Sequence, residues 1–148
     1  ALAHARLLRY GSMHRNTYVD SPRVLNTDLS LMSAPDVFLA GQITGVEGYV
    51  ESAAMGILAG LSVHARLKGS PFVAPPPESA IGALLHYITN RSLACFQPMN
   101  INFGIMPVTD APRKIRAEVI SERARREFGA WMEHMGKGPT PHGDEDEI

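Results

Sequence analysis

Residues 40–60, AGQITGVEGYVESAAMGILAG, decide the fold that we expect, because a glycine-rich turn here joins an apolar run to a helical pattern. The apolar run, residues 36–40, is short and rich in strand-forming residues, which is typical of a strand buried on both faces. From residue 49 to residue 67 apolar side chains recur at helical spacing. The sequence therefore predicts a strand, a tight turn and a helix in direct succession.

The turn itself predicts a site for an anionic group or for a ring edge that gains negative charge. A helix N-terminus presents free N–H groups and about half a positive charge, and glycine lets the backbone approach a ligand closely. Phosphate is the usual guest, and the pyrimidine edge of a reduced flavin would also suit. The glycines fall at 41, 45 and 48, so neither the dinucleotide fingerprint nor a P-loop is present. A purely structural corner that needs positive φ is the alternative.

The predicted helix carries a stripe of small residues, Ser52, Gly56 and Gly60, spaced four residues apart. Glycine costs about 1 kcal/mol relative to alanine inside a helix. Two glycines on one face therefore predict that another segment packs too closely for a side chain.

Two more helices are expected further along the chain. Residues 78–89 place Ile81, Leu84, Leu85 and Ile88 on one side, and residues 112–135 begin with a proline that suits a first helical turn. A proline-rich connector precedes the first of them, and the prolines of FQPMNINFGIMP, residues 96–107, argue against a central strand there. Residues 5–10 and 29–32 are expected to form short strands.

The bulk composition indicates one ordinary globular unit. The 148 residues are 45% hydrophobic and 20% charged, with a formal net charge of −1, so the chain as a whole shows no bias towards nucleic acid or membrane. A single cysteine excludes a disulfide framework. No apolar run reaches the roughly 20 residues of a membrane span, and we expect a soluble, cytoplasmic protein. The chain starts at Ala1 instead of Met, from which we expect a piece of something longer.

Four segments between residues 9 and 104 carry a family resemblance by their sequence and their order: RYGSMHRNTY, FLAGQITGVEGYVESAAMGILAG, AIGALLHYIT and FQPMNINFG. Together they resemble the C-terminal part of the folate-dependent tRNA (uracil-5-)-methyltransferase family, TrmFO. Such a set is far more specific than one glycine motif. The related glucose-inhibited division protein A family shares a segment similar to the glycine-rich one but lacks MHRNT.

The resemblance implies an α/β fold, namely the C-terminal portion of a FAD-binding doubly wound (Rossmann-like) fold with added C-terminal helices and a disordered acidic tail. Residues 1–70 would belong to the FAD-binding domain, residues 71–135 to a helical extension and residues 136–148 to the tail. Members of the family use reduced flavin and methylenetetrahydrofolate to make 5-methyluridine in the tRNA T loop, and NAD(P)H supplies the electrons. The implied partners are tRNA, folate and a missing N-terminal part of the same protein, with no membrane.

The resemblance also assigns candidate site residues. Those expected to bind the flavin ring of FAD are Gly41, Gln42, Gly45, Val46, Glu47, Gly48 and Tyr49. Those expected to bind folate are His14, Arg15 and Asn16, and those expected to bind tRNA are Arg113, Lys114 and Arg116.

Each assignment has a plainer alternative. His14 would simply be solvated, Glu47 would only complement the helix dipole, and Tyr49 would only pack. The arginines of residues 112–135 are interleaved with acids, which favours a solvated helix with internal ion pairs. No second His, Cys or acid lies at metal-ligand spacing from His14, so no metal is expected.

No catalytic residue is expected in this chain, because the family's dinucleotide fingerprint and catalytic cysteines lie upstream of the matched region. Cys95 is interpreted as a small buried hydrophobe and not as a nucleophile. Asn100 and Asn102 would either satisfy backbone groups or form a pocket wall beside the flavin. Two competing interpretations stay open: a fragment of a related FAD-dependent protein that modifies wobble uridine, and a non-catalytic interaction module of the same fold.

Overall fold

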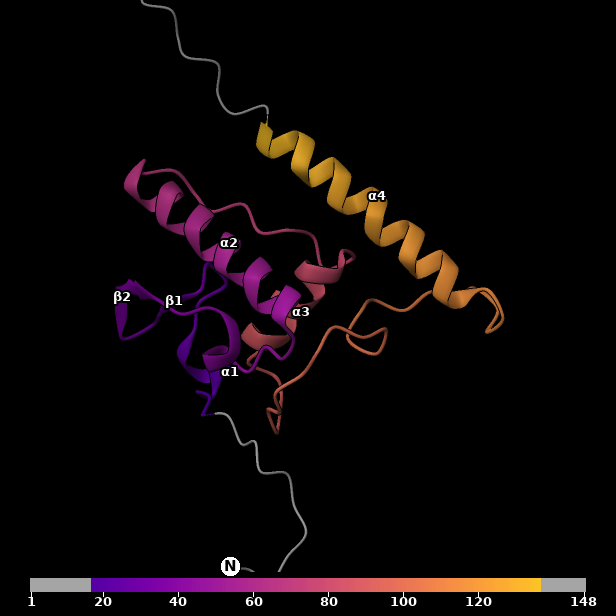
Figure 1. Cartoon of the computed structure of the whole chain (residues 1–148), viewed down its shortest axis with the longest axis horizontal. Coiled ribbons are helices and arrows are strands. Elements are labelled where there is room, and N and C mark those ends of the chain that lie inside the picture. The colour runs from indigo at the N-terminus through magenta and orange to yellow at the C-terminus, as the bar shows by residue number, and fades with distance from the viewer. Residues whose placement is uncertain (1–16, 137–148) are drawn as a thin grey trace, which may run out of the picture.

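The computed structural model describes residues 17–136 as a small mixed structure of helices and one hairpin (Figure 1). The strand predicted at residues 5–10, the residues His14, Arg15 and Asn16, and the tail lie outside the described residues. The elements in chain order are α1 (Ser21–Val24), β1 (Ser30–Leu31), β2 (Ala34–Phe38), the 3-10 helix η1 (Gly41–Thr44), α2 (Tyr49–Leu67), α3 (Ala80–Thr89) and α4 (Arg116–Gly136).

The strand before the glycine turn differs from the prediction. β2 pairs with β1 in a two-stranded antiparallel sheet, in which Ser30 lies opposite Phe38 and Leu31 opposite Ala34. The middle of β2 is exposed, and Val37 keeps 45% of its surface accessible. The prediction of a strand buried on both faces is therefore wrong for the described residues, because β2 has one partner strand and no layer over its outer face.

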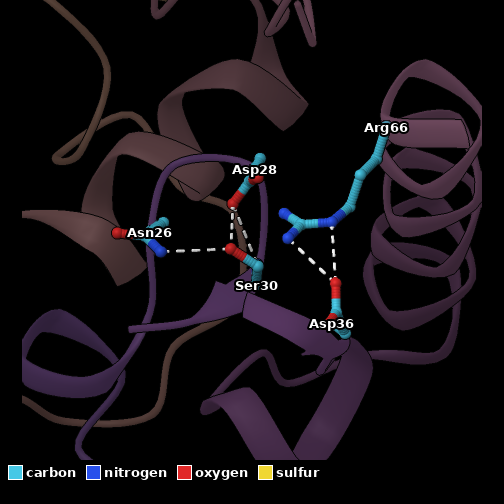
Figure 2. A network of polar contacts seen from close by, with 5 residues as sticks. All are labelled: Asn26, Asp28, Ser30, Asp36 and Arg66. Carbon is cyan, nitrogen blue, oxygen red and sulfur yellow. Dashed lines mark hydrogen bonds and ion pairs between the residues drawn. The ribbon is translucent and has the colours of Figure 1, made fainter. Parts of the chain in front are cut away.

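A polar network fixes the hairpin and ties it to α2 (Figure 2). Asn26 Nδ2 donates to Ser30 Oγ at 3.1 Å, and Ser30 Oγ donates to Asp28 Oδ1 at 2.6 Å. Arg66, near the end of α2, reaches Asp36 on β2 with both Nε, at 3.0 Å, and Nη2, at 2.9 Å. The hairpin is thus held at the start of its first strand by one set of bonds and at its second strand by another.

Helix α2 begins and ends where the sequence predicts, but its glycine stripe lies in open space. Met55, Leu58 and Ser62 form the buried side of the helix. Apart from the neighbouring backbone of the helix itself, no atom of the described residues lies within 4 Å of a Cβ built on Gly56 or on Gly60. The expected close packing against these glycines is therefore absent from this part of the chain.

Helix α3 is held at its start by Ser79 and by the proline-rich connector. Ser79 Oγ accepts a hydrogen bond from the N–H of Gly82 at 3.1 Å and donates to the carbonyl of Pro76 at 2.6 Å. Four apolar residues of this helix, Ala83, Leu84, Leu85 and Ile88, are at most 2% exposed. The predicted apolar face of this helix is confirmed.

Helix α4 begins at Arg116, later than predicted, because the preceding residues form a turn in which the Ile115 N–H bonds to the Pro112 carbonyl at 3.0 Å. Trp131 anchors the helix by donating Nε1–H to the Val73 carbonyl at 3.1 Å. The main core cluster spans both sides of residue 70 and contains Leu25, Leu29, Val46, Met55, Leu58, Leu84, Leu85, Ile88 and Trp131. Within residues 17–136, none of the helices is both long and apolar enough to cross a membrane.

Candidate functional site

The glycine turn adopts the backbone conformation that its sequence predicts. Gly41, Gly45 and Gly48 have φ of 75°, 78° and 94°, a region that other residues adopt at a cost. Two buried hydroxyl groups hold the turn. Thr44 Oγ1 donates to the Gly41 carbonyl at 2.7 Å, and Ser21 Oγ donates to the Thr44 carbonyl at 2.9 Å. Its shape is therefore set before any ligand arrives.

The segment FQPMN braces the turn from the other side. The N–H of Glu47 bonds to the Met99 carbonyl at 3.0 Å, and the N–H of Met99 bonds to the Gly45 carbonyl at 2.9 Å, which makes a parallel bridge between Val46 and Met99. The ring of Phe96 lies on Gly45, where a Cβ would come 2.5 Å from Phe96 Cζ. Two of the segments that carry the family resemblance are thus in direct contact.

The mouth of α2 is open at its N-terminus. Gly48 is the N-cap and no side chain bonds to the first-turn N–H groups; the first backbone bond runs from the Ser52 N–H to the Gly48 carbonyl at 3.0 Å. The Glu51 carboxylate lies against the Cα of Gly48, and Asn100 Nδ2 is 2.9 Å from the position of a Cβ there. Asn100 therefore forms a wall beside the turn.

A cavity of about 310 Å³ opens at this mouth, lined by Gln42, Gly48, Tyr49 and Ser52. Gln42 is exposed, and Tyr49 keeps 98% of its surface accessible. Both side chains are available to a ligand, because neither takes part in the packed core. The cavity combines a helix N-terminus, an amide and a phenol, which suits a planar polar group. The Glu51 carboxylate beside Gly48 offsets part of the positive field of the helix end.

The structure brings together some of the predicted flavin residues and separates others. Gln42, Gly48 and Tyr49 line the cavity, whereas Val46 is fully buried in the core and is not part of the lining. The Glu47 side chain is exposed and makes no hydrogen bond or ion pair within residues 17–136. Ser52 was missed, although its position one turn after Gly48 on the same helix face would have indicated it.

Burial and contacts decide the roles of Cys95 and of Tyr87, a residue of α3. Cys95 is exposed, so the expectation of a buried hydrophobe is wrong; it lies in an irregular segment that leaves its side chain at the surface. Tyr87 is structural, because its hydroxyl donates to the Gln97 carbonyl at 2.8 Å and its ring packs 5.7 Å from that of Phe96.

The predicted basic cluster lies at the surface before and at the start of α4. Arg113, Lys114 and Arg116 are all exposed. Arg113 and Arg116 line a second cavity, of about 330 Å³, together with Phe103 and Met106. Among the described residues, no three or more His, Cys, Asp or Glu side chains are grouped to hold a metal ion.

Comparisons with known proteins agree with the resemblance seen in the sequence. The family model of Glucose inhibited division protein A matches residues 1–71. The methylenetetrahydrofolate–tRNA-(uracil-5-)-methyltransferase TrmFO of Syntrophus aciditrophicus is 50% identical over 135 residues, which cover 88% of this chain and 30% of that protein. The proteins of the same name from Myxococcus xanthus and Streptococcus agalactiae are 49% and 47% identical, over 91% and 90% of the chain and 31% of each protein.

The match thus extends over most of this chain, and the chain spans about three tenths of the length of these relatives. The described fold has the mixed helix and strand content that the resemblance implies. The chain is accordingly a homologue of the TrmFO tRNA methyltransferases and corresponds to part of their length.

Proposed function

We propose that this chain is the C-terminal part of a flavin- and folate-dependent tRNA methyltransferase that makes 5-methyluridine in the T loop. Its role would be to form the flavin-ring side of the FAD site and part of the folate pocket. The proposal rests above all on one observation: the N-terminus of α2, which has no side-chain cap, opens on a cavity lined by Gln42, Gly48 and Tyr49. The chain that carries this cavity is 50% and 49% identical to two proteins named TrmFO.

The residues at the mouth of α2 fit the edge of an isoalloxazine ring. Three glycines with positive φ let the backbone approach a flat group. Within the described residues no side chain hydrogen-bonds to the first-turn N–H groups, although the Glu51 carboxylate of that turn lies against Gly48 and shares their positive field with any ligand. These N–H groups would stabilise negative charge on the pyrimidine edge by about 0.3–2 kcal/mol. When bound, FAD would supply the electrons that the methylation consumes, with NAD(P)H as their source.

The remaining parts of the proposal concern the partners. His14, Arg15 and Asn16 would bind methylenetetrahydrofolate, and Arg113, Lys114 and Arg116 would bind tRNA through phosphate contacts. The rest of the protein would complete the doubly wound fold and hold the adenine end of FAD. A cytoplasmic location follows from a tRNA substrate.

A second candidate is the modification of wobble uridine by a related FAD-dependent protein. It is favoured by the match of residues 1–71 to the Glucose inhibited division protein A model. The TrmFO relatives match about nine tenths of the chain, and this match includes the second half, which the family model leaves unmatched. Methylation is therefore the stronger proposal.

A chimera tests the proposal. The matching segment of the Myxococcus xanthus relative is replaced by this chain, and the purified protein is assayed for bound FAD and for 5-methyluridine in unmodified tRNA. We expect both, in the presence of methylenetetrahydrofolate and NAD(P)H. A chimera that melts like the unaltered relative but carries no FAD would overturn the proposal. Formation of modified wobble uridine in its place would favour the second candidate.

Side-chain variants of the chimera locate the flavin. Gln42→Ala and Tyr49→Ala should weaken FAD binding and leave the melting temperature unchanged, because both side chains are exposed and lie outside the core. Lys68→Ala, at the other end of α2, is the matched control and should change neither. Normal FAD affinity in both cavity variants would make the turn a structural corner only.

The folate assignment has its own test. His14→Ala in the chimera should raise the methylenetetrahydrofolate concentration needed for half-maximal rate while FAD stays bound. Loss of FAD without a separate folate defect would make His14 part of the flavin site instead.

A further inference from the structure

We propose that the cavity in front of α4 binds one unpaired nucleotide of an RNA strand, with the base on Phe103 and a phosphate at Arg113 and Arg116. The cavity measures about 330 Å³ and lies apart from the mouth of α2. The choice of RNA over other anions rests on the proposed function, but the site itself is argued from its own residues.

The charge of the cavity is of one sign. Arg113 and Arg116 line it, Lys114 lies exposed beside them, and none of the lining residues is acidic. Within residues 17–136 neither arginine takes part in an ion pair. Arg116 Nε donates to the Ala111 carbonyl at 3.3 Å, which leaves its two terminal nitrogens for a phosphate.

An aromatic face stands beside these charges. Phe103 keeps 51% of its surface exposed although it borders a cavity, and the floor below it is apolar, with Met106 and Ile120 at 7% and 3% exposure. A base stacks on such a ring without regard to its identity. A simple inorganic anion would use the arginines but would leave the ring and the floor unused.

Both walls of the cavity are preformed. Asn102 orders the turn that carries Phe103, because its Oδ1 accepts from the Gly104 N–H at 2.8 Å and its Nδ2 donates to the Asn100 carbonyl at 3.0 Å. Arg123 of α4 donates to the carbonyls of Pro107 and of Val108, a lining residue, and so fixes that part of the cavity. A ligand therefore meets a fixed frame, which lowers the ordering cost of binding.

The volume of the cavity favours a small ligand, such as a single nucleotide. At about 330 Å³ it lies at the small end of ligand sites, which run from about 300 to 1,000 Å³. One ring with one phosphate suits this space better than a folded peptide does. A strand of unpaired RNA can insert a splayed base there, whereas a base inside a duplex cannot reach the ring.

Fluorescence anisotropy of a labelled single-stranded RNA heptamer, with this chain in low salt, tests the proposal. Phe103→Leu should weaken binding by about tenfold, because it removes the stacking face but keeps an apolar side chain. Arg113→Gln should weaken binding and lower the slope of log affinity against log salt by about 0.7. Phe103→Tyr, which keeps the ring, should bind as the unaltered chain does, and circular dichroism checks that every variant is folded.

The control is Arg125→Gln, which removes one positive charge from α4 outside this cavity. Equal weakening by Arg125→Gln and Arg113→Gln would overturn the site in favour of diffuse attraction. Unchanged binding in Phe103→Leu would also overturn it. Uridine monophosphate should compete with the heptamer; if it binds while the heptamer does not, the ligand is a free nucleotide and the RNA assignment is wrong.

The outcome is separable from that of the proposed function. A chimera that holds FAD and methylates tRNA while its Phe103→Leu variant binds RNA normally refutes only this site. A chain that binds RNA through Phe103 in a chimera without FAD refutes the methyltransferase and leaves the nucleotide site standing.

Discussion

Gly82 and Pro76 are in direct contact: a Cβ on Gly82 would overlap the carbonyl group of Pro76 and would lie 2.7 Å from the Pro75 oxygen. The same Pro76 carbonyl accepts the hydroxyl of Ser79, the N-cap of α3. The proline-rich connector is thus locked onto the first turn of the most apolar helix. The connector can lie this close to α3 only because Gly82 has no Cβ.

Gly82→Ala should therefore destabilise the chain although alanine is the better helix former. Overpacking of this kind costs about 1–3 kcal/mol, which urea denaturation measures directly. Gly129→Ala in α4, where a Cβ meets nothing within 4 Å of the described residues, is the matched control and should stabilise by up to about 1 kcal/mol. Equal effects at the two positions would show that the contact with Pro76 does not matter.

Gly45→Ala should cost stability for two separable reasons, the contact with Phe96 and the φ of 78°. The left-handed conformation alone costs an alanine about 1–2 kcal/mol. In a Phe96→Ala background only that part should remain, so the penalty for Gly45→Ala should become smaller. A double-mutant cycle by urea denaturation measures the difference, and strictly additive effects would contradict the contact.

Asp36→Asn should change stability little. The carboxylate is 90% exposed and its partner Arg66 is 42% exposed, and exposed ion pairs contribute about 0–1 kcal/mol. The small loss should vanish in 1 M salt, where screening removes the pair's attraction. A salt-independent loss of several kcal/mol would show that the hairpin needs this bond to stay on α2.

The chain alone should form no 5-methyluridine. It carries no dinucleotide fingerprint, and its one cysteine, Cys95, lies at the surface away from the cavity lined by Gln42 and Tyr49. The assay supplies unmodified tRNA, FAD, methylenetetrahydrofolate and NAD(P)H. Product above a blank without protein would contradict the proposal that catalysis needs the rest of the relatives' length.

Helices α2 and α3 were predictable because each follows from local chemistry, whereas α4 begins later than predicted and the short helices α1 and η1 were not predicted. Periodicity gave the bounds of α2, and the apolar stripe of α3 gave its buried side. Residue type permits the positive φ values at Gly41, Gly45 and Gly48, since glycine adopts them without strain, but the helical glycines at 56 and 60 show that it does not impose them.

The errors concern what lies opposite a residue, which periodicity does not encode. The apolar run before the turn became an exposed edge strand, because Ser30 and Leu31 pair with it on one side only. The glycines at 56 and 60 face open space in the described part of the chain. Pairing of Val46 with Met99 joins positions too distant in sequence for a local pattern to foresee. The ligand site at the turn stays a prediction, and the cavity found there is also lined by Ser52, which was not among the predicted residues.

Trp131, the only tryptophan of the chain, hydrogen-bonds to Val73 and is 8% exposed. That position places an intrinsic fluorophore where α4 contacts the connector. Its emission will move to longer wavelength when α4 leaves the core, even if the helix stays coiled and the circular dichroism is unchanged. The molecule therefore carries its own optical probe for the docking of its last helix, without any label.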